Sequence, residues 1–166
     1  RVVVPTTAAV AQALAPLVAR WPAEPIILDP RGADPDQFAA QKRAAFGAAD
    51  AALAASGTVS LELAAAGTPM VIAYDMNWLS WHIMSRMAKI DTFTLVNLIS
   101  GSKAVPEFLG PACQPAPIAA ALSALLTDGA ARAAQEVAME ETMKALGLGG
   151  EPPGLRAARA VLRGLA

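Results

Sequence analysis

The sequence predicts an α/β domain in which a Rossmann-like parallel sheet is flanked by helices. Short apolar runs alternate along the chain with longer helical patterns, and these short runs are continuously apolar instead of alternating with polar residues. Continuous apolar strands separated by helices are typical of parallel sheets covered on both faces. The chain has 166 residues, of which 55% are hydrophobic, so we expect residues 1–166 to form one domain.

The first half of the chain supplies strands and helices in alternation. We expect strands at Val2–Val4 and Ile26–Leu28, a further one ending near Ala55, and the most apolar one at Pro69–Tyr74. The helical patterns between them cover about 7–20, 36–48 and 58–66. Gly67 is expected to end the last of these helices.

Beyond Tyr74 the pattern is less regular. A segment that is apolar nearly all round predicts a helix over 77–89, and further helices are expected over 117–126, 128–146 and 155–165. Thr92–Val96 is expected to be a strand, and Ser100–Pro106 a loop.

Composition argues against several classes of protein. The formal net charge of -1 gives no broad attraction to nucleic acid, so we expect no nucleic-acid partner. The single cysteine allows no internal disulfide, and no apolar run approaches the roughly 18 residues that cross a bilayer. No His, Cys or carboxylate cluster has metal-ligand spacing, so neither a metal site nor a cofactor is expected. Because the chain opens inside an apolar run without Met, we interpret it as a fragment.

The stretch that carries chemistry runs from Ala54 to Glu62. A strand ends, the small residues Ser56-Gly57-Thr58 turn the chain, and a helix begins. A glycine turn before a helix N-terminus is suited to binding a phosphate. Glu62 lies four residues after Thr58 and therefore on the same helix face, where it could accept hydrogen bonds from ribose hydroxyls. The alternative is that Ser56 or Thr58 simply caps the helix and Glu62 is solvated.

The chain resembles the lipid-A-disaccharide synthase family in four ordered blocks. The blocks are AASGTVSLELAAAGTP at 54–69, Met70–Tyr74, Asn97-Leu98-Ile99, and Val105-Pro106-Glu107-Phe108-Leu109. Their order and spacing also match the family. The likeness runs from about Val2 to Leu162.

This resemblance implies the C-terminal lobe of a GT-B glycosyltransferase, a fold in which two Rossmann-like lobes face across a cleft. The C-terminal lobe holds the UDP part of the donor. By resemblance, Ser56, Gly57 and Thr58 lie at the diphosphate and Glu62 at the ribose. Asn97 and Glu107 fall in blocks that line the same cleft.

The resemblance also implies a reaction. The family transfers an acylated glucosamine from UDP to the 6-hydroxyl of an acylated glucosamine 1-phosphate, with inversion, to give the β-1,6-linked lipid A disaccharide. The catalytic base is expected in an N-terminal lobe that this sequence lacks, so we expect the isolated chain to bind UDP weakly and to be inactive. The implied location is cytoplasmic, peripheral to the inner face of the cytoplasmic membrane of a Gram-negative bacterium.

Some positions depart from the family pattern. Asp75 stands where the family often has Arg or Lys, Val96 where it often has Pro, and Ser102 where it often has Arg. No basic phosphate contact is carried over to these positions. Lys103 is a candidate to replace the missing arginine.

A dense apolar patch follows the fourth predicted strand. Its members include Trp78, Leu79, Trp81 and Met84, and two interpretations stay open. The first is packing against the sheet or against a second subunit in a homodimer. The second is contact with acyl chains or the membrane interface, where Trp is favoured. His82, the only histidine, lies in this segment and is interpreted as a packing residue rather than a general base.

Two rival functions also stay open at this stage. One is a GT-B glycosyltransferase that acts on a different UDP-sugar, against which the Asn97 and Pro106-Glu107 blocks argue. The other is a non-enzymatic α/β interaction module that dimerises through Trp78 and Trp81. Selective binding of UDP would separate the enzyme hypotheses from the module.

Overall fold

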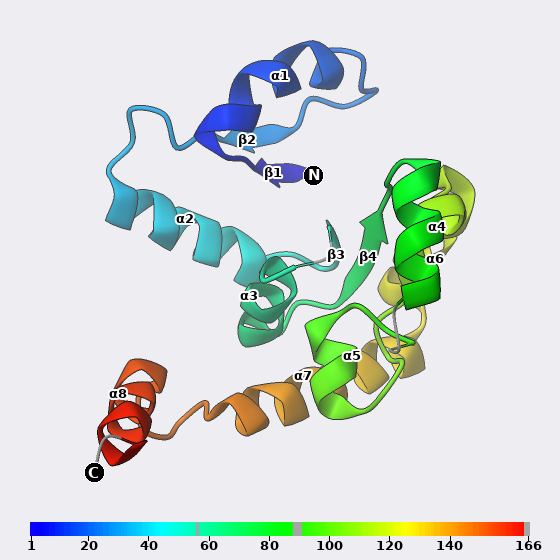
Figure 1. Cartoon of the computed structure of the whole chain (residues 1–166). Coiled ribbons are helices and arrows are strands. Elements are labelled where there is room, and N and C mark those ends of the chain that lie inside the picture. The colour runs from blue at the N-terminus through cyan, green and yellow to red at the C-terminus, as the bar shows by residue number, and fades with distance from the viewer. Residues whose placement is uncertain (56, 88–90, 165–166) are drawn as a thin grey trace. The chain divides into compact units, whose positions relative to one another are not determined.

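A computed structural model describes residues 1–55, 57–87 and 91–164, and within that range it leaves a few side chains undescribed, namely those of Leu79, Ser80, Met84, Ser85, Met87 and Pro153. The chain forms two compact units, Arg1–Ala49 and Asp50–Ala166. Each unit has its own parallel sheet with helices beside it (Figure 1), which confirms the predicted fold class.

The first unit is a strand–helix–strand–helix segment. Strand β1 (Val3–Pro5) pairs in parallel with β2 (Ile26–Leu28), and helix α1 (Ala8–Val18) connects them. Helix α2 (Pro35–Gly47) follows, and the Asp34 carboxylate caps it by accepting a hydrogen bond of 2.9 Å from the backbone N–H of its third residue. These elements lie where the apolar runs predicted them, within two residues or so at each end.

The second unit contains a parallel sheet in the order β3 (Ala52–Ala54), β4 (Met70–Tyr74), β5 (Glu107–Leu109). The central strand β4 is the core of this unit, since Met70, Val71 and Ile72 have no exposed surface. Burying each of these side chains stabilises the fold by about 1.5–3 kcal/mol. The continuous apolar run at 70–72 is therefore explained by burial on both faces of a central parallel strand.

The helices of this unit are α3 (Val59–Ala66), α4 (Trp78–Met87), α5 (Leu95–Ser100), the 3-10 turn η1 (Gly110–Ala112), α6 (Pro115–Thr127), α7 (Gly129–Leu146) and α8 (Pro153–Gly164). Some of them pack on the sheet of the second unit, namely α3 on β3 and α6 on β4. Helix α7 packs against α3, α5 and α6, and α6 also contacts β4 (Figure 1). None of the helices in the described ranges is long and apolar enough to cross a membrane.

The expected strand at Thr92–Val96 is wrong. Thr94 is extended, but Thr92–Thr94 pair with no strand of the described sheet, and α5 begins at Leu95. The backbone N–H groups of Phe93 and Thr94 donate to the side chain of Glu107 and not to a neighbouring strand. Val96 is fully buried within α5, and its carbonyl accepts a hydrogen bond of 3.2 Å from the Thr142 hydroxyl on α7. Packing on α7 therefore outweighs the strand preference of this β-branched segment.

Gln135 binds α7 to the N-terminal end of β4. Its side chain is 1% exposed; it accepts a hydrogen bond of 2.8 Å from the Met70 N–H and donates one of 3.0 Å to the Met70 carbonyl.

Replacing Gln135 with Leu should cost about 2 kcal/mol of unfolding free energy, because both buried Met70 groups lose their partner. Urea unfolding with Trp21 replaced by Phe, so that fluorescence reports the second unit, measures this loss. The exposed Gln114, replaced by Leu, is the matched control, and an equal loss in both variants would contradict the prediction.

Candidate functional site

The carboxyl ends of β3, β4 and β5 meet at one edge of the sheet, because all three strands are parallel. The residues that follow these ends are the Gly57-Thr58 turn, Asp75 and Gly110. In open α/β sheets, ligands bind outside the carboxyl ends of the strands. A functional site is therefore expected at this edge of the sheet.

Gly57 makes the turn after β3. Its backbone φ is +143°, which side chains of L residues rarely adopt, and a Cβ atom placed there would meet nothing within 4 Å. A ligand can therefore approach the backbone of Gly57 closely. The Ser60 hydroxyl donates a hydrogen bond of 2.8 Å to the Gly57 carbonyl and holds the turn in place. Ser56, also predicted for this turn, lies outside the described residues.

Thr58 and Glu62 stand at the start of α3. Thr58 is the N-cap residue, yet its side chain makes no capping hydrogen bond, and it is exposed. The hypothesis that Thr58 serves only as a side-chain cap therefore loses support. Glu62 lies in the first turn and is exposed. Gly57, Thr58 and Glu62 therefore form one accessible group at the helix N-terminus, where the helix dipole favours an anion.

Asn97 is placed differently. It is 2% exposed, and both ends of its amide bind the backbone of Val105: Nδ2 donates to the carbonyl at 2.8 Å and Oδ1 accepts from the N–H at 2.9 Å. Asn97 thus ties α5 to the loop that leads into β5. Asn97 itself lies inside α5.

Glu107, the first residue of β5, anchors the segment before α5. Its carboxylate accepts hydrogen bonds from the Thr92 hydroxyl at 2.7 Å and from the Thr94 N–H at 2.6 Å. The Phe93 N–H lies 3.1 Å from Oε1, and the Asn97 Nδ2 3.4 Å from the same oxygen. These donors hold residues 92–94 against the sheet.

Burial by itself raises the pKa of Glu107, but the hydrogen bonds outweigh it. Bonding from Thr94 and Thr92, and from the N–H of Phe93, holds the pKa of this carboxyl below its ordinary value. The Thr94 hydroxyl is buried and has no hydrogen-bond partner among the described residues, so we assign the Thr94 contribution to its N–H. The carboxylate is therefore held ionised by groups of the protein itself.

The structure thus separates the predicted site residues into two groups. Gly57, Thr58 and Glu62 are exposed after β3, whereas Asn97 and Glu107 form an internal hydrogen-bond network. In the sheet register Glu107 is opposite Ile72, which is opposite Ala54, so this network lies level with the last residue of β3. Thr92 and Thr94 belong to the network but carried no signal in the sequence, because only the fold brings them to Glu107.

Comparison with known proteins decides the family. The model of the lipid-A-disaccharide synthetase family matches residues 35–151. The chain belongs to this family. Among curated relatives, the lipid-A-disaccharide synthase of Ruegeria pomeroyi is 63% identical over 162 residues, which is 98% of this chain and 40% of the relative. Those of Paramagnetospirillum magneticum and Rhodospirillum centenum are 44% and 41% identical over 97% and 98% of this chain, and over 40% and 38% of their own lengths.

Membership of the lipid-A-disaccharide synthase family confirms the resemblance found in the sequence and implies the GT-B fold. The chain spans about 40% of the length of the Ruegeria relative. The family match covers the Gly57 turn, Asn97 and Glu107, so both groups of residues lie within the matched region.

Lys103 and Asp75, which stand at or beside positions that depart from the family pattern, both have partners in the structure. Lys103, the candidate substitute for a missing arginine, forms an ion pair of 2.9 Å with Asp91, and both side chains are exposed. The Asp91 carboxylate raises the pKa of Lys103, and Lys103 lowers the pKa of Asp91. Lys103 therefore has a partner within the protein. Asp75, at the carboxyl end of β4, accepts a hydrogen bond of 2.8 Å from the Met76 N–H.

The aromatic patch divides into an outer and an inner part. Trp78 is 73% exposed, and its ring stacks on that of His82, with centroids 5.3 Å apart. Trp81 is half-buried, and its ring lies where a Cβ of Gly110 would be. Leu79 and Met84 lie in α4, but their side chains are outside the described part of the structure.

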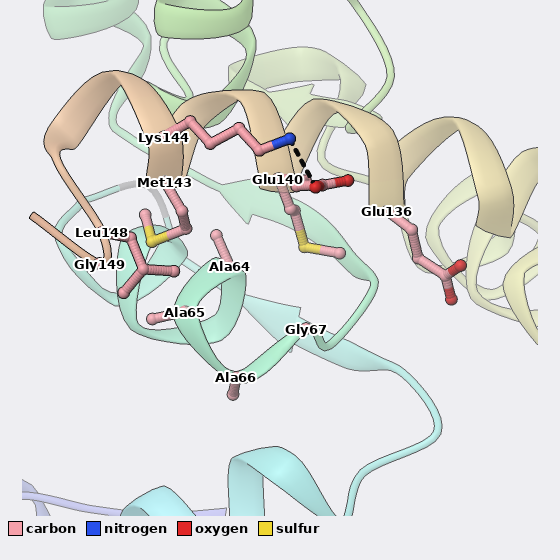
Figure 2. A pocket seen from close by; sticks show the side chains of 11 residues that line it. Ala64, Ala65, Ala66, Gly67, Glu136, Glu140, Met143, Lys144, Leu148 and Gly149 are labelled. Carbon is pink, nitrogen blue, oxygen red and sulfur yellow. Dashed lines mark ion pairs between the residues drawn. The ribbon is translucent and has the colours of Figure 1, made fainter.

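A separate cavity in the described part of the chain lies elsewhere. It is an open groove of about 590 Å³ between α7 and the C-terminal end of α3, with Ala64–Gly67 on one side and Met139 and Met143 on the other (Figure 2). The Glu140–Lys144 ion pair of 2.6 Å lies on its rim. Since the Gly57 turn is at the opposite end of α3, this groove is not part of the candidate site.

Proposed function

We propose that this chain is the nucleotide-sugar-binding lobe of an inverting glycosyltransferase that makes the lipid A disaccharide. The donor is UDP-2,3-diacylglucosamine, the acceptor is 2,3-diacylglucosamine 1-phosphate, and the products are the β-1,6-linked disaccharide and UDP. The observation that carries the proposal is the exposed Gly57-Thr58 turn, which precedes α3 at the carboxyl edge of a parallel sheet in a chain of this family.

The donor diphosphate binds at this turn. The backbone at Gly57 is open to a ligand, and the exposed Thr58 hydroxyl and the positive end of the α3 dipole favour phosphate oxygens there. Ser56 belongs to the same turn in the sequence. As the bond to the sugar breaks, negative charge grows on the diphosphate, and the helix N-terminus offsets it.

The remaining site residues position the rest of the donor. Glu62 accepts hydrogen bonds from the two ribose hydroxyls, since it follows Thr58 by one helical turn. Asn97 and Glu107 support the same cleft from within, because their internal hydrogen bonds fix the backbone around it. The general base that deprotonates the acceptor hydroxyl belongs to an N-terminal lobe of the same enzyme, and no residue of this chain is assigned that role.

We further propose that the protein works at the inner face of the cytoplasmic membrane. The exposed ring of Trp78 and the exposed side chain of Ile83 on α4 suit the interface between headgroups and acyl chains. Arg86, also exposed on this helix, is placed to meet lipid phosphates. Leu79, Trp81 and Met84, named with Trp78 from the sequence, belong to the same helix. A homodimer through the same face is the competing use of α4.

Titration with nucleotides tests the proposed function. Calorimetry of this chain should show binding of UDP with a dissociation constant at least about tenfold lower than that of ADP. The reason is that a binding site for a UDP-sugar discriminates uracil from adenine. The isolated chain should show no glycosyl transfer, since it lacks the proposed base. Turnover by this chain alone would contradict the division of roles between the lobes. A longer protein containing both lobes that binds no UDP would contradict the proposal itself.

A further inference from the structure

A second cavity lies at the same edge of the sheet as the Gly57 turn. It has a volume of about 180 Å³ and lies between the start of α4 and the turn that follows β5. Its apolar walls come from Met76, Trp78, Trp81, Pro111 and Cys113. Asp75 and Gln114, both exposed, add a carboxylate and a carboxamide to the lining.

One wall of this cavity depends on a glycine. Gly110 has a φ of +51°, and a Cβ atom on it would lie 2.5 Å from Cδ2 of Trp81. No side chain fits there, so the indole of Trp81 rests directly on the backbone of η1. This contact turns Trp81 inward, whereas Trp78, three residues earlier, is 73% exposed. Trp78 nevertheless also lines the cavity, which therefore adjoins the exposed face of α4.

The position of the cavity relates it to the donor. β4 and β5 are the strands next to β3, and neighbouring strands are about 4.8 Å apart. In a UDP-sugar, the ribose and the sugar extend from opposite ends of the diphosphate. With the diphosphate at Gly57 and the ribose at Glu62, the carboxyl ends of β4 and β5 are left for the sugar and its substituents.

We propose that this cavity is a subsite for an acyl chain of the donor sugar, an inference that rests on the proposed function. The apolar walls take methylene groups, each of which raises affinity about fourfold when it leaves water. The polar groups of Asp75 and Gln114 suit the amide that joins such a chain to the sugar: the carboxylate accepts from the amide N–H, and the carboxamide donates to its carbonyl. The subsite makes this lobe selective for acylated donors.

Filling the cavity tests the inference in a protein that contains both lobes. Replacing Cys113 with Phe should raise KM for the diacylated donor at least tenfold and leave the dissociation constant of UDP within twofold of wild type. Cys113→Ser, which keeps the volume, should change neither value by more than twofold. An unchanged KM for the diacylated donor in a Cys113→Phe variant with wild-type thermal stability would overturn the subsite. Loss of UDP binding in the wild type would instead count against the proposed function.

Chemical modification of the unaltered protein gives a second measurement, in case Cys113→Phe does not fold. Cys113 is the only cysteine of this chain, and its alkylation by N-ethylmaleimide can be followed by mass spectrometry of its peptide. The diacylated donor should slow this reaction at least fivefold, whereas UDP and UDP-N-acetylglucosamine should not. Equal rates with all three ligands would overturn the inference. Equal protection by phosphatidylglycerol vesicles without donor would assign the cavity to bilayer lipid and overturn it too.

Discussion

Replacing Glu62 with Ala is expected to weaken UDP binding by about 2–3 kcal/mol, or roughly 30- to 150-fold. The physical reason is that a carboxylate forms strong hydrogen bonds with hydroxyl donors, and two ribose hydroxyls lose their acceptor together. Glu62 is exposed at the first turn of α3, so the substitution should leave the fold intact. Calorimetric titration of the wild type and the variant measures the difference.

A ligand without the ribose hydroxyls gives the control for this result. The 2′,3′-dideoxy analogue of UDP should bind the wild type and Glu62→Ala with equal affinity, because the interaction removed by the substitution is already absent. If Glu62→Ala weakened UDP and the analogue by the same factor, Glu62 would act on the diphosphate or on the fold. The proposed ribose contact would then be wrong.

The second large effect is expected at Glu107. Replacing it with Ala should lower the unfolding free energy by about 3 kcal/mol, since buried Thr92 and the N–H groups before α5 lose their acceptor. Urea unfolding measures this change. Glu140→Ala is the matched control: Glu140 is an exposed carboxylate paired with Lys144, and its removal should change stability little.

The contribution of Glu107 should also depend on pH. Its folded pKa is depressed below the ordinary 4.5, so the ionised carboxylate stabilises the fold fully above that pH. The contribution is lost as pH falls through the folded pKa. The stability difference between wild type and Glu107→Gln should therefore shrink in urea titrations below about pH 4.5. A difference that stays constant between pH 7 and pH 3 would show that the carboxylate charge plays no part.

The two groups of site residues explain how one edge of the sheet can be both open and rigid. Gly57 and Thr58 leave backbone and hydroxyl groups exposed, which suits a ligand with several phosphate oxygens. Asn97 and Glu107 use their polar atoms within the protein and fix the loops beside that edge. Preorganised groups of this kind lose little entropy when the ligand arrives.

Patterns of residues close together in the chain predicted several elements of the fold. The apolar run at 70–72 predicted a buried parallel strand, and β4 is fully buried there. Small residues at 56–58 before a helical pattern predicted a turn and a helix start, which the described residues 57 and 58 confirm. Such features depend on residues close in the chain, so periodicity and turn chemistry reveal them.

Contacts between distant residues decided the rest. Thr92–Val96 was predicted as a strand, yet Glu107, more than ten residues later, binds the backbone before Leu95, and α7 buries Val96. The short strand β5 exists because it pairs with β4. The wall that Trp81 forms against Gly110 also required the tertiary structure, because nothing in either local sequence indicates the other. The sequence by itself thus determined the fold class, the family and the turn before α3. Only the tertiary structure decided which polar side chains form hydrogen bonds within the protein and where the second cavity lies.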